Sequence, residues 1–403
     1  MIQKIAFRNI WRNKLRSWVV IGSISLGIFG GLAVISTAKG LAKMRQDKAI
    51  KTYVSHIQIH DSNYLDYGRF EDVIPSDEQL IKYLENQKGV YFSPRLKIES
   101  FVQSARGTSG VVLNGINPEQ EKQVTNVFEL CQEGNYLQEY KRKPPIIISQ
   151  KLAEKLNAGI KTTIQCTFSD ANGLPVAGGF KVVDIYKTSN SMYDEVNAFV
   201  RLEDLQALSS NYGTHEIAIL LPTEKGADKL KTALEDQFTE VEIKTWRGIA
   251  PELGYADKMM DLVMTIFLIV IMLALAFGII NTMLMAVLER KKELGMLLSV
   301  GMNKRKVFWM IVWESIFLAL IAGPIGILIA YITIQFFQQV GIDLSFAAAG
   351  LRSVGLDSVI YPYIDSIYYL AISILVILTS ILSCIYPAQR ALKLNPAEIV
   401  RGA

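Results

Sequence analysis

Few residues in this sequence have the type and spacing needed for catalysis or metal binding. There is no HExxH, CxxC or GxSxG motif. His56 and His60 belong to a segment, HIQIH, that alternates like a β-strand, and four strand residues span about 13 Å, too far for one metal ion. Asn157–Thr163 (NAGIKTT) lacks the GxxxxGK[ST] spacing of a phosphate-binding loop. We therefore predict no catalytic residue, no metal site and no enzymatic activity for this chain.

A charged cluster between two apolar segments carries more information. Residues 281–301 read NTMLMAVLERKKELGMLLSVG, so the charges at 289–293 precede an apolar stripe. This pattern suits a short amphipathic helix at the membrane face or in the groove of a partner, with a solvated connector as the alternative. Glu314 lies about two turns into the next apolar segment. We interpret Glu314 as a structural partner of that helix, with a proton-transfer site as the alternative.

Four long apolar segments, three of them free of charged residues and the third along the chain interrupted only by Glu314, are the elements that must position these residues. A bilayer core about 30 Å thick needs roughly 20 helical residues. The expected transmembrane spans are 18–38, 262–288, 307–338 and 366–387. The first follows a basic N-terminus but is longer than the apolar part of a cleaved signal peptide, so we expect it to be a retained anchor. Residues 1–17, with cations at Arg8, Arg12 and Arg16, predict an amphipathic helix.

The basic residues of the short flanks predict the orientation. Residues 1–17 hold five Lys or Arg and no acid, and residues 289–306 hold six against two acids. Residues 341–365 have only Arg352 against three Asp. The cations that follow the first span disagree, but long domains translocate largely regardless of charge. We predict a multi-pass protein of the bacterial inner membrane with both termini (the tail is 388–403) and loop 289–306 cytoplasmic, and with residues 39–261 and loop 339–365 periplasmic.

The 223 residues between the first two spans have the pattern of an α/β domain. Alternating or apolar runs predict strands at 56–60, 145–149, 164–168, 180–185, 197–200 and 216–221. Periodic segments predict helices at 76–88, 150–157 and 224–237. Two lobes fit this length, 40–142 with 214–258 and 143–213. The predicted fold class is an α-helical membrane protein with four transmembrane helices in a 1+3 order and a large α/β extracytoplasmic domain between the first and second.

Three motifs resemble the FtsX/MacB superfamily of ABC-transporter permeases. Ala6–Ser17 (AFRNIWRNKLRS) is similar to the opening of its members. The middle motif matches the pattern around their coupling helix at Asn281, Met285, Glu289, Arg290, Glu293, Gly295 and Gly301. The final motif matches their tail at Tyr386, Pro387, Ala388, Ala391, Pro396, Ala397 and Arg401. HIQIH, the run 185–208 and Trp246 ahead of Pro251 look most like the lipoprotein-releasing (Lol-type, LolC/LolE) branch.

The resemblance implies a permease subunit that works by mechanotransmission. Two copies of a separate ABC ATPase would bind ATP and Mg²⁺, so this chain itself would hold no cofactor. Closure of the ATPase would push on the coupling helix, and a second permease subunit, identical or homologous, would complete the membrane part. The residues expected to couple to the ATPase are Glu289, Arg290, Glu293, Leu294, Gly295, Leu297 and Gly301.

Two further sets of residues are candidates within the membrane. Ser23, Gly27 and Gly31 form a small-xxx-small face that allows close helix approach in lipid. The acyl chains of a lipoprotein need an apolar path open to the membrane lipids, and the alternative is that such residues simply face lipid. The candidates for this path are Leu32, Ile35, Val263, Ile266 and Phe267.

Lipoprotein release is the main functional hypothesis. The alternatives are a MacB-type efflux permease for drugs or peptides and an FtsX-like regulator of cell-wall hydrolases without transport. Members of the last kind usually have a much smaller outer domain. In Lol-type systems one permease carries a long hairpin that recruits a periplasmic carrier, and the corresponding turn here, 169–179, is short. The expected partners are the ATPase, a second permease subunit, membrane lipids and a lipoprotein or other amphiphilic cargo, but no nucleic acid. A periplasmic carrier is a further candidate, although the short turn argues against its docking on this subunit.

Overall fold

The computed structural model describes residues 2–12, 14–75, 77–132, 136–137, 143–170, 172–347, 350–351 and 358–392, without the side chains of Arg16, Lys225, Ala256 and Asp257. The described chain forms two compact units. The first comprises residues 1–43, 257–343 and 359–403, and the second comprises residues 44–256 and 344–358. The tail residues Pro396, Ala397 and Arg401 of the final motif lie outside the described residues.

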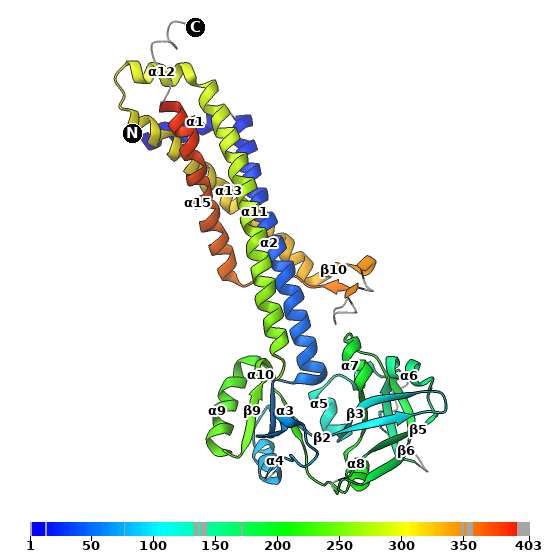
Figure 1. The fold of residues 1–403 in the computed structure, drawn as a ribbon. Coiled ribbons are helices and arrows are strands. Elements are labelled where there is room, and N and C mark those ends of the chain that lie inside the picture. Colours follow the sequence, from blue (N-terminus) through cyan, green and yellow to red (C-terminus); the bar gives the residue numbers. More distant parts are fainter. Residues whose placement is uncertain are drawn as a thin grey trace. The chain divides into compact units, whose positions relative to one another are not determined.

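Six helices build most of the first unit (Figure 1). They are α1 (Ile2–Arg12), α2 (Lys14–Ala49), α11 (Pro251–Glu289), α12 (Lys291–Ser299), α13 (Lys304–Val340) and α15 (Ser366–Leu392). Within the described residues, four stretches are long and apolar enough to cross a membrane, and they correspond to α2, α11, α13 and α15. These helices continue beyond the uncharged runs of the sequence. Charged residues end a membrane span but not a helix, because straight-chain charged residues form helices well.

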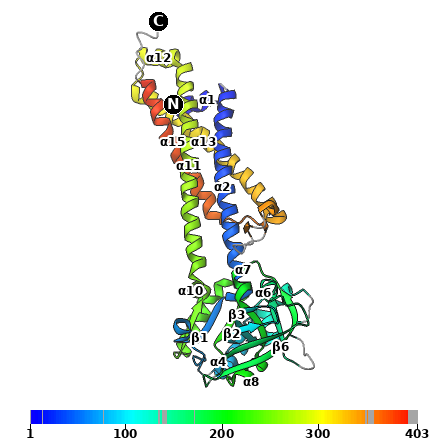
Figure 2. The same ribbon diagram turned by 45° about the vertical axis from the view of Figure 1, so that its right-hand side comes forward.

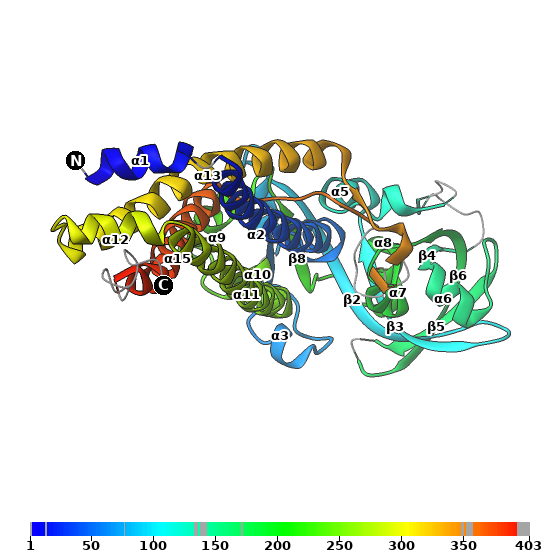
Figure 3. The same ribbon diagram turned by 90° about the horizontal axis from the view of Figure 1, so that it is seen from above.

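The helices of this unit share one apolar core. Ala6 and Ile10 of α1 are fully buried in it, together with residues of α2, α11, α12, α13 and α15. Figure 3 shows α1 and α13 lying side by side, seen from above. α1 ends at Arg12 and α2 begins at Lys14, so the described residues of 1–17 belong to two helices instead of one. The Ser17 hydroxyl of α2 donates to the Ile10 carbonyl (2.6 Å), which satisfies a carbonyl left open by the end of α1.

The close contact between α2 and α13 depends on a small residue that the sequence patterns did not single out. The Ser25 hydroxyl donates to the Ala322 carbonyl (3.0 Å). A Cβ atom at Gly326 would stand 2.8 Å from the Ser25 carbonyl oxygen and 2.9 Å from the Ile28 Cβ. At Gly323, one turn earlier, nothing lies within 4 Å of the same position. Gly326 is therefore the residue that allows the two backbones to approach.

The second unit contains one mixed sheet. Its strands are β1 (Ile57–Asp61), β2 (Tyr91–Gln103), β3 (Thr108–Ile116), β4 (Pro145–Ser149), β5 (Thr163–Ser169), β6 (Pro175–Tyr186), β7 (Asn197–Arg201), β8 (Glu216–Leu220) and β9 (Val241–Thr245). The strand order is β3-β7-β4-β6-β5-β2-β8-β1-β9, and β2 also pairs with β3. That additional pairing closes six of the described strands (β2, β3, β7, β4, β6, β5) into a ring. The first part of β2 extends beyond the ring and pairs with β8.

This arrangement differs from the two lobes expected from the sequence. Residues 91–116 were expected to belong with 214–258, but most of β2 and all of β3 enclose the same core as β4 to β7. The remaining strands, β1, β8 and β9, form a separate core with residues of α4 (Asp77–Glu85) and α9 (Ala227–Gln237). β2 thus belongs to both parts, because its length lets successive segments pair with different neighbours. The turn between β5 and β6 is short, with only 170–174 between the paired residues Ser169 and Pro175.

Helices surround the strands of this unit (Figure 2). Those not yet named are α3 (Tyr64–Tyr67), α5 (Pro118–Val124), α6 (Gln150–Leu156), α7 (Ser191–Val196), α8 (Leu202–Ser209) and α10 (Trp246–Ile249), and Ile50–Val54 forms a π-helical turn. Side-chain caps fix the starts of α5, α6 and α7. For example, the Ser149 hydroxyl at the end of β4 accepts from the Leu152 backbone N–H (3.0 Å), which starts α6 directly after the strand.

A buried ion cluster connects β2, β8 and α5. The Arg95 guanidinium donates to Glu121 (2.7 Å) and to Glu216 (2.5 Å), and Lys97 also donates to Glu216. Arg95, Glu121 and Glu216 are at most about 5% exposed, so their charges depend on one another for compensation. Burial alone would raise the pKa of Glu216, but the charges of Lys97 and Arg95 outweigh it and lower this pKa to about 2. The cluster fixes α5 and β8 to the shared strand.

Candidate functional site

The charged cluster of the sequence forms the short helix α12 between α11 and α13. Its end is set by Gly301, whose backbone φ of +91° favours glycine and whose N–H donates to the Leu298 carbonyl (3.1 Å). The Asn303 side chain then accepts from the Arg305 N–H (2.9 Å) and caps the start of α13. Gly301, expected among the coupling residues, therefore has the specific role of ending α12 and allowing the turn into α13.

A chain of ion pairs ties α12 to two other helices. One nitrogen of the Arg12 guanidinium lies 2.5 Å from both carboxylate oxygens of Glu293, which links α1 to α12. Arg290 donates to the same carboxylate (3.2 Å) and also to Glu314 of α13 (3.1 Å). Glu314 is buried, with a side chain only 5% exposed, and Arg290 is 14% exposed. The intramembrane acid of the sequence therefore contacts the N-terminal end of α12.

The electrostatics of the exposed pair follow from this geometry. The hydrogen bond from Arg12 is the largest cause that lowers the pKa of Glu293, burial opposes it, and the hydrogen bond from Arg290 lowers this pKa further. The same hydrogen bond raises the pKa of Arg12. Both groups are half-exposed, with side-chain exposures of 55% for Arg12 and 44% for Glu293. The pair is therefore charged at neutral pH and accessible to solvent salt.

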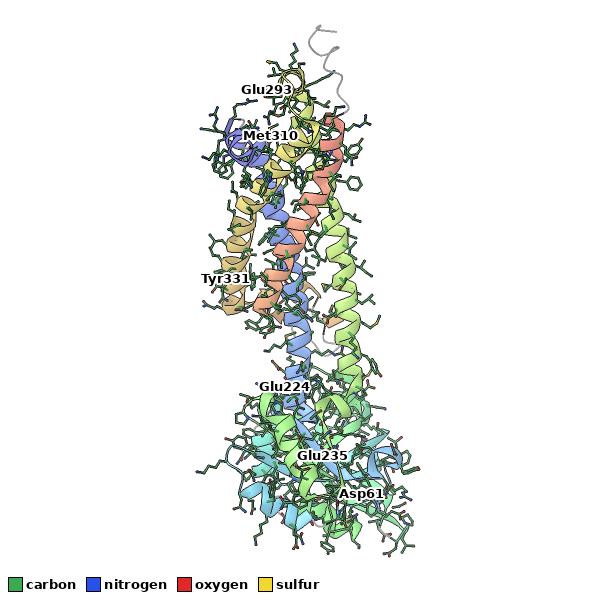
Figure 4. All side chains as sticks on the ribbon, turned by 90° about the vertical axis from the view of Figure 1, so that its left-hand side faces the viewer. Asp61, Glu224, Glu235, Glu293, Met310 and Tyr331 are labelled. Carbon is green, nitrogen blue, oxygen red and sulfur yellow. The ribbon has the colours of Figure 1, made fainter. Side chains whose placement is uncertain are left out.

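A groove of about 800 Å³ runs between α1, α12 and the start of α13. Cations from α1 line one side, namely Lys4, Arg8 and Arg12. Apolar side chains line the other, namely Met296, Leu297, Val300 and Met310. Figure 4 labels Glu293 and Met310 at the same end of the helices, with Tyr331 farther along α13. The groove combines positive charge with an apolar floor.

Three of the predicted coupling residues lie wholly or partly against the other helices. Leu294 and Gly295 are buried against the other helices, and Leu297 is partly buried. The neighbouring Met296 and Val300, which belong to the apolar stripe of the sequence, are 59% and 86% exposed. Exposed apolar side chains in a groove are typical of a protein-binding surface. Among the described residues, Met296 and Val300 are therefore better placed than Leu294 and Gly295 to touch a partner.

Asn9 is a functional candidate that the sequence did not reveal. It lines the groove from α1 and is only 8% exposed. Its amide nitrogen has no hydrogen-bond partner among the described residues. A buried donor without a partner costs about 1–3 kcal/mol, so an acceptor that entered the groove would be favoured. The sequence around Asn9 does not indicate a binding role. That role follows only from the packing of α1 against α12, which buries the Asn9 amide beside the groove.

The residues proposed to form an acyl-chain path do not meet in one cavity. Leu32 is fully buried in the helix core, and Ile35 lines a cavity next to Met264 and Leu268. Val263, Ile266 and Phe267 are 38–53% exposed on α11 and do not line that cavity. On α11 the positions 263, 266 and 267 are i, i+3 and i+4, so they share one exposed helix face, whereas Met264 and Leu268 line the cavity. The five residues thus form two sets, one buried on α2 and one exposed on α11.

The three small residues of α2 predicted to form one packing face, Ser23, Gly27 and Gly31, have different surroundings in the structure. A Cβ at Gly27 would meet Leu275 of α11 at 2.2 Å, and one at Gly31 would meet Leu268 at 3.6 Å. Gly27 therefore leaves room for the Leu275 side chain of α11, whereas a Cβ at Gly31 would make only an ordinary van der Waals contact. Ser23 is exposed, and its hydroxyl donates to the Val19 carbonyl of its own helix (2.9 Å).

The second unit offers no evident reaction centre in the part of the chain that the structure describes. No group of three or more His, Cys, Asp or Glu side chains there could hold a metal ion. The His60 ring is buried, and its Nδ1 lies 2.9 Å from the His215 carbonyl oxygen. Burial lowers the pKa of His60 to about 4, while the charge of Glu216 opposes this shift. Such a histidine is neutral and structural at neutral pH.

Comparison with known proteins gives two family matches. Residues 17–237 match the MacB-like periplasmic core domain, and residues 265–396 match the FtsX-like permease C-terminal domain. The lipoprotein-releasing system transmembrane protein LolC of Neisseria meningitidis is 23% identical over 97% of this chain and 95% of its own length. An uncharacterized ABC transporter permease of Methanocaldococcus jannaschii is 22% identical over 98% of this chain and 96% of its own length.

A solved structure gives a further match. The periplasmic region of MacB from Actinobacillus actinomycetemcomitans aligns with 52% of this chain and 97% of its own length, at 11% identity and a TM-score of 0.36. The two family matches together cover most of the second unit and the helical part of the chain from residue 265 on. The four helices able to cross a membrane make the chain an integral membrane protein. The chain belongs to the FtsX/MacB family of ABC-transporter permeases.

Proposed function

We propose that this chain is the permease subunit of a transporter in which a separate ATPase binds ATP and Mg²⁺ and docks in the groove between α1 and α12. The observation that carries the proposal is the groove itself. It presents exposed Met296 and Val300 beside the cations of α1 and the unpartnered amide of Asn9. A partner element with apolar and acidic side chains and a free backbone carbonyl would fit all three features.

The ion pairs then transmit the motion of the ATPase into the membrane helices. A push on α12 reaches α1 through Arg12 and reaches α13 through the Arg290–Glu314 pair. Because α12 is also packed into the helix core through Leu294, it moves as part of a rigid body and not as a loose loop. Two permease subunits and two ATPase subunits would form the working transporter.

Substitutions on the exposed side of α12 test this docking. Met296→Glu and Val300→Glu add a charge to the apolar wall and should abolish co-purification of the ATPase. Ser299→Glu is the matched control, since Ser299 is exposed on the same helix but does not line the groove. Normal ATPase binding by both groove variants would overturn the proposal. Loss of binding by Ser299→Glu as well would indicate damage to α12 and not to the docking surface.

Lipoproteins are the proposed cargo. The support is the similarity along nearly the whole chain to a protein named as part of a lipoprotein-releasing system. Acyl chains would enter from the membrane along the exposed face of α11 at Val263, Ile266 and Phe267. A lysine there that lines the path should block release of a lipoprotein from spheroplasts while ATP hydrolysis continues. A transporter that releases no lipoprotein but exports drugs or peptides would instead have the MacB-type function. One that releases no lipoprotein but activates a cell-wall hydrolase would have the FtsX-like function.

The proposed location is the bacterial inner membrane, with both termini in the cytoplasm and the strand-rich unit in the periplasm. It rests on the basic residues at 1–17 and 289–306. Reporter fusions after Gln46, Asn303 and Asp357 should report outside, inside and outside; Asp357 lies outside the described residues. A cytoplasmic signal at Gln46 would overturn this topology.

A further inference from the structure

The first unit contains a second cavity, far along the helices from α12. It measures about 360 Å³, which lies within the range of roughly 300–1,000 Å³ typical of small-molecule pockets. Residues of α2, α11 and α15 line it. Most of its wall is aliphatic, formed by Ile35, Met264, Leu268, Ala371, Ile372 and Leu375. A wall of this kind suits a hydrocarbon chain and gives water few hydrogen bonds.

A pair of opposite charges lies at one side of this cavity. Lys39 of α2 donates to the carboxylate of Asp261 on α11, and both residues line the cavity. The Lys39 ammonium also lies 5.8 Å from the centre of the Tyr368 ring of α15. Asp261 keeps about half of its side chain exposed, and Lys39 about a quarter. The charges are therefore paired but still accessible.

These charges lie where the apolar parts of the helices end. Lys39 directly follows the uncharged run 18–38, and Asp261 directly precedes the uncharged run 262–288. Tyr368 is two residues into α15. Lysine, tyrosine and aspartate at such positions belong to the boundary between headgroups and hydrocarbon. The cavity thus has its charged part at headgroup level and its aliphatic part alongside the acyl chains.

We propose that this cavity is a binding site for one zwitterionic phospholipid with a primary ammonium, such as phosphatidylethanolamine. One acyl chain fills the aliphatic part. The phosphate accepts from Lys39, whose ammonium has three N–H donors and gives one to Asp261. The lipid ammonium donates to the Asp261 carboxylate. An anionic headgroup satisfies only the lysine and adds its negative charge beside Asp261, so a headgroup of both signs is the better match.

The site is separate from the α1–α12 groove and does not depend on the proposed docking of an ATPase. It also differs from the exposed face of α11 along which cargo would enter, because Val263, Ile266 and Phe267 do not line the cavity. A resident lipid here would hold α2, α11 and α15 together at one membrane surface. The stability of this helix contact would then depend on the phospholipids of the membrane that surrounds the permease.

The test uses the full-length permease in nanodiscs of equimolar phosphatidylethanolamine and phosphatidylglycerol. Native mass spectrometry after detergent release counts the lipids that remain bound. The wild type should retain one phosphatidylethanolamine. Lys39→Met removes the charged contact to the phosphate and should lower the retention of phosphatidylethanolamine by about tenfold to a hundredfold, as the loss of a hydrogen bond to a charged group does. Ile372→Trp should have the same effect by filling the cavity.

Two matched controls separate the site from general damage. Lys43→Met removes a cation one turn farther along α2 that lies over the Tyr363 ring and does not line the cavity. Ile374→Trp enlarges a half-exposed residue of α15 outside the cavity. Both should retain the lipid. Asp261→Asn gives a second readout that does not depend on loss of binding. It removes the carboxylate that accepts from the lipid ammonium, so the retained lipid should change from phosphatidylethanolamine to phosphatidylglycerol.

Three outcomes would overturn the inference. The first is a wild type that retains no lipid above the level of Ile372→Trp. The second is a wild type that prefers phosphatidylglycerol, or whose preference Asp261→Asn does not change. The third is retention of an acylated protein in place of a phospholipid, which would make the cavity part of the cargo path.

Discussion

The carboxylate of Glu293 accepts from the guanidinium of Arg12 across 281 residues of sequence, with both oxygens 2.5 Å from one nitrogen. This contact joins the N-terminal helix to the short helix that the family's coupling motif occupies. It is exposed, so it contributes little to folding stability. Its position matters because, under the docking proposed above, a displacement of α12 would reach α1 through this ion pair.

Loss of this link should reduce coupling more than stability. Arg12→Gln and Glu293→Gln should each change the free energy of unfolding by less than about 1 kcal/mol, as exposed ion pairs do. Each should lower the amount of lipoprotein released per ATP hydrolysed in proteoliposomes. The double variant should be no worse than either single one, because both remove the same contact. Additive losses would show that the two residues act separately.

The Arg290–Glu314 pair should respond differently, because it is mostly buried. Glu314→Met leaves a guanidinium without this partner and should cost about 3–5 kcal/mol, measured by thermal unfolding in detergent. The combined variant Arg290→Met, Glu314→Met should recover most of that stability, since two apolar residues of similar size replace the buried charges. If Glu314 transferred protons instead, Glu314→Met would be as stable as the wild type. The combined variant would then still fail to transport.

The glycines of α13 make a prediction with an internal control. Gly326→Ala would place a methyl group 2.8 Å from the Ser25 backbone, which cannot move away as a side chain can, and should cost about 1–3 kcal/mol. Gly323→Ala meets nothing within 4 Å and should stabilise α13 by up to about 1 kcal/mol through helix propensity. Thermal unfolding of both variants measures the difference. Equal effects at the two positions would mean that α2 and α13 do not approach at Gly326.

The sequence predicted the membrane helices well because their signal is local. Uncharged runs such as 18–38 and 262–288 mark the hydrocarbon core directly. It did not predict β2 and β3. β2 contains Pro94 and the charged residues Arg95, Lys97 and Glu99, a composition that argues against a largely buried strand. Arg95 and Lys97 are compensated by Glu216, whose nearness depends on the tertiary fold.

The candidate site was predictable only in part, because some of its contacts depend on the tertiary fold. The motif indicated the segment that forms α12, and Glu314 lies within hydrogen-bond distance of Arg290 at its N-terminal end, while its structural role stays a prediction. Whether a given side chain of α12 faces the helix core or the groove depends on how α12 lies against α1 and α13. That is why Leu294 and Gly295 proved buried while Met296 and Val300 proved exposed. The opposing cations and the amide of Asn9 come from the far end of the chain, and no local pattern brings the two segments together.

The last prediction concerns the stability of the strand-rich unit at acid pH. Burial is the largest cause that lowers the pKa of His60, which reaches about 4, so the folded state holds this ring neutral. Between about pH 6.5 and pH 4 the unfolded chain binds a proton at His60 that the folded chain does not, and stability therefore falls as the pH falls. A pKa lowered by about 2.5 units corresponds to about 3 kcal/mol. Glu216, whose pKa is lowered to about 2, extends the loss below about pH 4.5, where its unfolded form becomes protonated first.

Urea unfolding followed by the fluorescence of Trp246 measures this effect. Trp246 is buried beside the strand-rich core, and replacing the other four tryptophans by Phe makes it the sole reporter. The free energy of unfolding should fall by about 3 kcal/mol between pH 6.5 and pH 4 from His60, with smaller contributions from the buried His56 and His215, whose pKa values burial also lowers. His60→Gln should make the curve flatter in this window, whatever its effect on stability at pH 7. A curve of unchanged slope in His60→Gln would show that His60 titrates alike in the folded and unfolded chain.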